Sequence, residues 1–171
     1  MKKLEKESLE NKPKRQRETV GSVIQIRIDN SYYVYAQILR LGQYVFFDYR
    51  SQELLKDLSV LNSANILFIL SVDSYPVNVG RWLKVGKLPI RIEFENLPNK
   101  YIFDKFKREF SLYITETGEI LPSTKGEVRG LEQCAVWGEN HVVDRIRDYY
   151  NKVPCKWLQT EYELFQELKP Y

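Results

Sequence analysis

The chain has 171 residues, of which 43% are hydrophobic, 29% charged and 13% aromatic, with a formal net charge of +3. This composition describes a folded globular protein with one hydrophobic core, and it excludes a disordered body. No apolar run approaches the roughly 20 residues that cross a bilayer, and residues 1–19 lack the apolar centre of a signal peptide, so we expect a cytoplasmic protein that does not bind membranes.

The first 19 residues form a basic segment. They carry seven Lys or Arg and four Glu, so their net charge of +3 equals that of the whole chain. Because short charged termini are commonly mobile, we expect a flexible basic leader at 1–19 in front of a single domain at 20–171. The alternative is that these cations contact nucleic acid or another anionic surface.

Strands are expected next along the chain. Alternating β-branched residues predict a strand over 23–29, and turn residues follow it. Residues 32–40 and 43–49 predict two more strands joined at Gly42, which together give an antiparallel meander. A loop or helical turn is expected at 48–61, and the apolar run at 65–72 predicts a buried central strand.

The strand pattern continues to residue 121. Residues 82–85 and 87–94 predict strand on either side of Gly86, with Pro89 at an edge or bulge because proline has no N–H to donate to a sheet. Residues 101–110 are aromatic and ambiguous. A turn at 116–119, with apolar residues on both sides, predicts a hairpin.

Helices are expected from residue 124 to the end. Thr124 and Glu127 have the spacing of a capping box, which predicts a short helix to Leu131. Apolar residues fall on one stripe at 139–150, and this spacing recurs at about 157–168. With β-rich residues 20–121 and helical residues 124–171, the sequence predicts an α+β fold: a strongly twisted antiparallel sheet or partly open barrel, with helices packed on it from the C-terminal third.

The sequence lacks the common catalytic and metal-binding motifs. The sequence has no GxSxG, P-loop or HExxH motif, and no GxGxxG after a strand. His141 could act as a general base beside Cys134 or Glu139, but we favour a histidine at the helix surface. One histidine and two cysteines without a CxxC motif do not complete a zinc site. We therefore expect no enzyme activity, no metal and no cofactor, and we expect Cys134 and Cys155 to be free thiols.

Aromatic residues are concentrated on the first paired strands. Such a sheet face could stack unpaired bases, so a nucleic-acid-binding module that also uses the basic leader is the alternative function. We favour a core with cross-strand aromatic pairs, because the cluster lacks interleaved Lys and Arg. The cluster consists of Tyr32, Tyr33, Tyr35, Tyr44, Phe46, Phe47 and Tyr49.

Four parts of the chain carry a family pattern: residues 20–39, 66–68, 81–89 and 130–150. The third contains Trp82-x-x-x-Gly86-Lys87-x-Pro89, and the fourth has Gly-Leu-Glu at 130–132 before an Asp-Arg helix. In this order they resemble the immunity protein 26 family of bacterial polymorphic toxin systems, over about residues 20–150. Ser22 and Ala36 depart from the acidic residue and the glycine that are common there.

The resemblance implies an immunity protein that binds and neutralises a cognate toxin, frequently a nuclease, by a tight, non-catalytic interaction. It assigns no catalytic residues. We expect the residues that carry the resemblance to be structural, with Trp82 and Trp137 in the core rather than on the toxin. These residues are Gly21, Trp82, Gly86, Pro89, Gly130, Leu131, Glu132, Trp137, Asp144 and Arg145.

Four glutamates are candidate contacts to a basic toxin: Glu93, Glu95, Glu116 and Glu119. Exposed carboxylates attract basic partners and speed association. Glu93 and Glu95 would share one face of a strand, which could also hold an acid/base pair if their pKa values diverged. We favour a solvated strand face.

Overall fold

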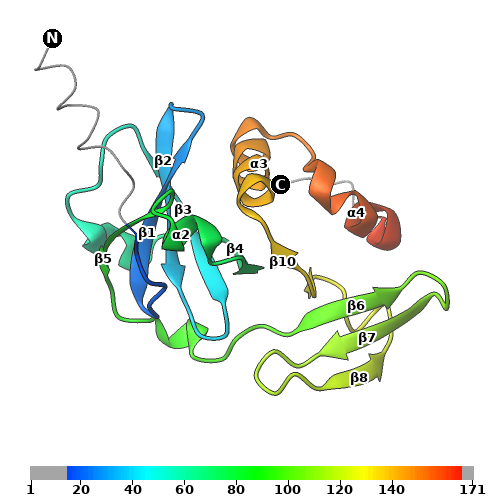
Figure 1. Ribbon diagram of the computed structural model, residues 1–171. Coiled ribbons are helices and arrows are strands. Elements are labelled where there is room, and N and C mark those ends of the chain that lie inside the picture. Colours follow the sequence, from blue (N-terminus) through cyan, green and yellow to red (C-terminus); the bar gives the residue numbers. More distant parts are fainter. Residues whose placement is uncertain (1–14, 167–171) are drawn as a thin grey trace, which may run out of the picture.

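The computed structural model describes residues 15–166, which form an α+β structure with two open sheets (Figure 1). The predicted α+β class is confirmed, but the strands form two sheets instead of one, and neither closes into a barrel. The larger sheet has the order β10-β4-β3-β2-β1-β5, and the smaller has β8-β7-β6-β9. The strands are β1 (Ser22–Ile28), β2 (Tyr32–Ile38), β3 (Gln43–Ser51), β4 (Ile66–Val72), β5 (Leu83–Lys87), β6 (Lys100–Asp104), β7 (Glu109–Tyr113), β8 (Ile120–Ser123), β9 (Glu132–Gln133) and β10 (Val136–Trp137).

The predicted meander is the centre of the larger sheet. Strands β1 to β4 pair antiparallel in chain order, and β5 pairs with β1. Asp29 and Asn30 connect β1 to β2, and Leu41 and Gly42 connect β2 to β3; all four have positive φ. Two positive φ angles in succession are what a type I′ hairpin turn requires, so these short turns set the register of the meander.

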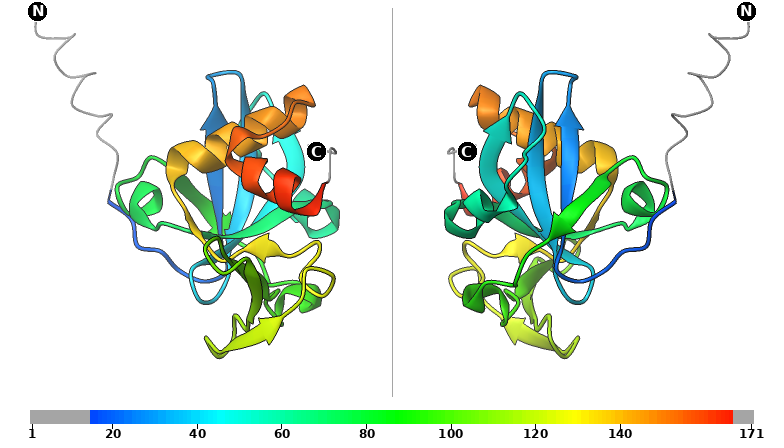
Figure 2. Two further views of the ribbon diagram at one scale, coloured as in Figure 1. Left: turned by 90° about the vertical axis from the view of Figure 1, so that its right-hand side faces the viewer. Right: turned by 90° about the vertical axis from the view of Figure 1, so that its left-hand side faces the viewer.

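Both faces of the larger sheet are buried. Helix α3 (Glu139–Asn151) crosses one face and contributes Val142 and Ile146 to that core (Figure 2). Leu61, from the 3-10 helix η1 (Leu58–Ser63), packs against the opposite face. Tyr35, Tyr44, Phe46 and Phe47 are at most 1% exposed. These four rings therefore belong to the core and are not available for stacking on bases.

The segment after β5 differs from the prediction. Strand β5 ends at Lys87, and the expected strand at 87–94 is wrong, because Ile92–Phe94 form a 3-10 helix, η2. The Gln37 amide explains the break, since its Nε2 donates to the carbonyl oxygen of Leu88 at 2.8 Å and to that of Pro89 at 3.4 Å. A side chain thus takes the place of a neighbouring strand beside Pro89, which has no N–H.

The smaller sheet lies beside the larger one (Figure 1). The ambiguous segment at 101–110 is strand, turn and strand, and the predicted hairpin around 116–119 is the β7–β8 connection. Tyr101 and Phe103 on β6 pair with Leu112 and Phe110 on β7. Phe165 of α4 (Gln159–Phe165) covers this face.

The C-terminal third contains strands as well as helices. The predicted helix at 139–150 is confirmed as α3. The predicted helix from Thr124 to Leu131 is wrong: the Glu127 carboxylate does accept the N–H of Thr124 at 2.9 Å, but turns follow, and Gly130 has φ +83°. The chain then adds β9 to one sheet and β10 to the other, each as a parallel neighbour.

Three other helical segments complete the described residues: α2 (Tyr75–Asn78), η3 (Lys156–Leu158) and α4. The sequence predicted a last helix at about 157–168; α4 ends at Phe165, and residues 167–171 lie outside the described part. No helix within residues 15–166 is long and apolar enough to cross a membrane.

The end of the predicted leader lies on the body of the protein. Residues 1–14 are outside the described part, but Gln16 is placed beside α2 and β5. Its Nε2 donates to the carbonyl oxygens of Val77 and Trp82 at 2.9 and 2.8 Å, and its Oε1 accepts the N–H of Lys84 at 2.8 Å.

Candidate functional site

The first group of resemblance residues joins β1 to the end of β5. Gly21, with φ +84°, donates its N–H to the carbonyl oxygen of Ile38 at 2.8 Å, and its own carbonyl oxygen accepts from the Leu88 N–H. Trp82 is buried against Phe46 in an edge-to-face contact. A Cβ at Gly86 would lie 2.4 Å from a methyl of Leu58, so β5 and η1 pack closely there. These contacts organise the larger sheet.

The second group joins α3 to both sheets. Arg145 on α3 donates to both carboxylate oxygens of Glu132 on β9, at 2.6 and 2.9 Å. The guanidinium carbon of Arg145 lies 4.3 Å from the ring centre of Phe68 and 4.9 Å from that of Trp137. Leu131 packs on the core of the smaller sheet. This group holds elements together and offers no reactive centre.

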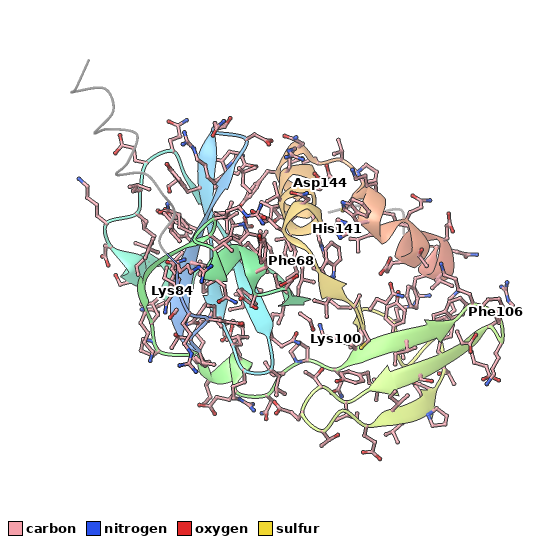
Figure 3. All side chains as sticks on the ribbon, viewed as in Figure 1. Phe68, Lys84, Lys100, Phe106, His141 and Asp144 are labelled. Carbon is pink, nitrogen blue, oxygen red and sulfur yellow. The ribbon has the colours of Figure 1, made fainter. Side chains whose placement is uncertain are left out.

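Asp144 belongs to a separate network on the outer side of α3 (Figure 3). It accepts from the indole N–H of Trp157 at 2.9 Å and from Arg147 at 2.6 Å. Arg147 also donates to the Asp29 carboxylate in the β1–β2 turn. Asp144 therefore connects the first hairpin of the sheet to the segment before α4.

The four candidate glutamates do not form one acidic cluster. Glu93 and Glu95 lie in and after η2 instead of on a strand face, and Glu93 is paired with Arg91. Glu116 accepts two hydrogen bonds from Arg40, at 2.7 and 2.9 Å, which hold the pKa of its carboxyl below the usual range. Glu95 and Glu119 are exposed and form no ion pair with residues 15–166.

Arg40 is the centre of the contact between η2 and the β7–β8 turn. Besides Glu116, its guanidinium donates to the carbonyl oxygen of Glu95 at 2.7 Å, and the Glu116 carboxylate accepts the N–H of Leu97 at 3.2 Å. Sequence reasoning did not single out Arg40, because an arginine at the end of a strand carries no signal of a partner 76 positions away.

A pocket of about 620 Å³ lies between the two sheets, and we call it the inter-sheet pocket. Its lining includes Leu41 and Gln43 at the β2–β3 turn, Tyr113 and Glu116 at the β7–β8 turn, and Cys134 and Val136 between β9 and β10. Gln43 is 3% exposed; its Nε2 donates to Ser71, whereas its buried Oε1 has no partner among the described residues. Leu41 and Val136 are exposed at its edge.

The cysteines are both free thiols, as expected. Burial raises the pKa of Cys134 and that of Cys155. The opposite shift occurs at the nearby Lys100, a residue that is 1% exposed, where burial lowers the pKa of the ammonium group. A thiol with a raised pKa is protonated at neutral pH and is a poor nucleophile.

His141 is not arranged as a catalytic base in the described structure. Its ring lies against the Trp157 ring, with 3.9 Å between the ring centres and 38° between the ring planes, and Cys134 lines a different pocket. Glu139, the other considered partner, forms an ion pair with Arg81 at 2.9 Å. Within residues 15–166, no group of three or more His, Cys, Asp or Glu side chains could hold a metal ion.

Comparisons with known proteins gave one family match. The model of the family described as immunity protein 26 matches residues 19–112. The match includes the first three segments of the resemblance, through Pro89, and ends before the fourth, which begins at Gly130. No curated protein and no solved structure matches the chain.

Proposed function

The chain belongs to the immunity protein 26 family, and from that premise we propose that it neutralises a cognate bacterial toxin by binding it tightly, without catalysing a reaction. The family match is the observation that carries the proposal. Two features of the described residues support the non-catalytic part: the His141 ring lies against the Trp157 ring, and partial burial raises the pKa of the Cys134 thiol.

The site of action that we propose is the cytoplasm of the cell that makes the toxin. There the protein must bind its toxin at low concentration and keep it bound, so the interface must be preorganised and must dissociate slowly. Neutralisation then follows from covering the toxin's active surface or from holding the toxin in an inactive shape.

We also propose that exposed carboxylates steer the toxin where it is a basic nuclease. Among the four candidates, Glu95 and Glu119 support this role best, because Glu93 and Glu116 are already paired with arginines. The unpaired carboxylates raise the encounter rate with a basic partner, and salt screens the effect.

The alternative function, a nucleic-acid-binding module, was based on two observations: an aromatic sheet face and a basic leader. The first does not hold in the folded chain. Four rings of the aromatic cluster are buried and cannot stack on bases. Its remaining support is the basic leader, most of which lies outside the described residues. Phosphate contacts give affinity a steep dependence on salt, so RNA binding by the full chain and by a chain lacking residues 1–19, measured against salt, separates the two functions.

Co-expression tests the proposal directly. The chain is produced together with the toxin domain encoded next to it, and growth and co-purification are measured. We expect rescue of growth and a stable complex of the two proteins. Neither rescue nor complex with any neighbouring toxin would contradict the proposal.

A further inference from the structure

The turn between β6 and β7 presents a fully exposed aromatic side chain. Phe106 lies at the tip of this hairpin, far from the larger sheet, and its relative exposure is 101% (Figure 3). The other aromatic residues of this hairpin behave differently, since Phe103 on β6 and Phe110 on β7 pack on each other with ring centres 4.7 Å apart. Phe106 therefore adds no packing to the fold of residues 15–166.

The backbone of this turn is held in one shape. The Asp104 carboxylate accepts the N–H of Phe106 at 2.9 Å and that of Lys107 at 3.0 Å, and the Asp104 carbonyl oxygen accepts the N–H of Arg108 at 2.7 Å. The two carboxylate bonds also hold the pKa of Asp104 below its ordinary value, so the group is ionised and accepting at neutral pH. A turn fixed in this way presents Phe106 without a large loss of loop entropy on binding.

The charge around Phe106 is positive. Lys105, Lys107 and Arg108 are exposed, and none forms an ion pair with residues 15–166. Asp104 is the acidic residue within the turn, and its carboxylate is occupied by backbone N–H groups. The tip thus combines one apolar ring with three cations; with the ionised Asp104 and the neighbouring Glu109 counted, residues 104–109 carry a net charge of +1, the opposite sign from the glutamates considered above.

We propose that residues 104–108 are a contact point for the toxin, with Phe106 entering an apolar pocket whose rim carries carboxylates. This inference rests on the proposed immunity function and specifies the chemistry of the partner. A large aromatic side chain that becomes buried in a pocket is typical of the few residues that dominate a protein interface, and cations around it pair with the rim.

A protein pocket fits these observations better than a lipid surface. A single anchoring group gives only marginal and reversible binding to a membrane, and three cations, at about 1 kcal/mol each, are fewer than the clusters of about four to eight that mark binding to anionic lipids. Insertion into a bilayer also does not require a turn of fixed shape. The hydrogen bonds to Asp104 fix the shape of this turn, a property that binding in a protein pocket would use.

The test measures binding of full-length variants to the toxin domain encoded next to this chain. Phe106→Ala should raise the dissociation constant roughly 30-fold or more, the change expected for a dominant interface residue. The matched control is Leu54→Ala, which truncates another exposed apolar side chain, 57% exposed, away from this turn and from the candidate glutamates. It should change the dissociation constant less than about threefold, as a side chain outside the contact does.

Two further variants test the role of the turn's shape and charge. Asp104→Ala should weaken binding and Asp104→Asn should restore part of it, because an amide oxygen can still accept the two N–H groups. Lys105→Glu with Lys107→Glu should slow association at about 0.1 M salt and much less at about 1 M, where the Debye length is about 3 Å.

Each outcome decides between the possibilities. Rescue by the wild-type chain, with Phe106→Ala binding as tightly as wild type, overturns the contact point and leaves the immunity function standing. A wild-type chain that binds no neighbouring toxin contradicts the immunity function, and the contact point falls with it. Phe106-dependent binding to phosphatidylglycerol vesicles or to single-stranded RNA, without such dependence for the toxin, also overturns the proposal.

Discussion

Arg145 on α3 and Glu132 on β9 form a two-point ion pair that joins the helix on the larger sheet to the smaller sheet. The side chains are only 12% and 26% exposed, and the guanidinium also lies over Phe68 and Trp137. The pair is shielded from water and makes two charge-assisted hydrogen bonds. Removing either side chain therefore leaves the charge of the other without a partner.

Loss of Arg145 should therefore destabilise the protein. We expect Arg145→Ala to lower the free energy of unfolding by about 3 kcal/mol, because it leaves a half-buried carboxylate unpaired and removes packing on two rings. Glu132→Gln should cost less, since a neutral amide can keep one hydrogen bond. Urea unfolding of the full chain measures both.

The exposed pair Arg81–Glu139 is the control for this prediction, because Arg81 is half exposed. Arg81→Ala should cost less than about 1 kcal/mol, as solvent-exposed ion pairs do. If Arg145→Ala and Arg81→Ala lowered the free energy of unfolding equally, the buried pair would stabilise the fold no more than the exposed pair.

Local patterns predicted most single elements of this fold. Strands β1 to β4, the turn at Asp29 and Asn30, and helix α3 follow from periodicity and turn chemistry that neighbouring residues supply. The failures at 87–94 and 124–131 have another cause. At 87–94, a distant contact from the Gln37 amide beside Pro89 overrides the local strand propensity. At 124–131, the positive φ of Gly130 overrides the local helix propensity.

Pairing between distant residues also limited prediction of the candidate site. The sequence pattern suggested Glu116 as an exposed carboxylate, but its partner, Arg40, is 76 positions away and is known only from the folded chain. The sequence pattern does not single out the tip at Phe106 either, for a different reason. An aromatic residue in a segment that also holds Phe103 and Phe110 looks like core until the turn places it outside.

The backbone at Gly21 gives a second prediction. Its φ of +84° costs a residue with a Cβ about 1–2 kcal/mol, and that Cβ would meet Lys87 Cε at 2.9 Å. Gly21→Ala should therefore lower the free energy of unfolding by about 1–2 kcal/mol. Gly126→Ala is the matched control, because open space surrounds it and its φ is not positive; it should stay within about 0.5 kcal/mol of wild type.

The Asp29–Arg147 pair gives a prediction about acid. The hydrogen bonds from Arg147 hold the pKa of Asp29 below its ordinary value. A carboxyl whose pKa is lower in the folded than in the unfolded chain stabilises the fold above about pH 4, and this contribution is lost as the pH falls through the folded-state pKa. Asp29→Asn should therefore make the urea midpoint fall less steeply between about pH 5 and about pH 2.

Salt provides the control for the acid prediction. The Asp29 side chain is 48% exposed, so its interaction with Arg147 is screened by ions. The difference in slope between Asp29→Asn and wild type should shrink at about 1 M salt. Identical slopes at low salt would contradict a stabilising role for this pair.

Charge reversal at the glutamates distinguishes steering from structure. If the toxin is a basic nuclease, Glu95→Lys with Glu119→Lys should slow its association at low salt and leave the free energy of unfolding unchanged. Glu116→Lys should destabilise the chain instead, because it places a like charge beside Arg40. An unchanged association rate for the double variant at low salt would remove the steering role.

The Gln16 amide gives a last prediction, about the free edge of the larger sheet. Strand β5 is an edge strand, and this one side chain donates to the carbonyl oxygen of Trp82 and accepts the N–H of Lys84, as a neighbouring strand would. Gln16→Ala should therefore speed hydrogen exchange at the Lys84 amide and favour self-association through the uncovered edge. Exchange followed by mass spectrometry measures the first effect, and sedimentation measures the second.

Truncation then locates the start of the folded unit. Removal of residues 1–19 should reproduce the fast Lys84 exchange of Gln16→Ala, because both delete the same two hydrogen bonds. Removal of residues 1–14 keeps Gln16 and should leave that amide protected. If removal of 1–19 leaves the Lys84 exchange rate unchanged, the folded unit begins at residue 20, as the sequence pattern predicted. If the Lys84 amide exchanges fast in the chain without residues 1–19 but slowly in the chain without residues 1–14, the folded unit starts at or before Gln16.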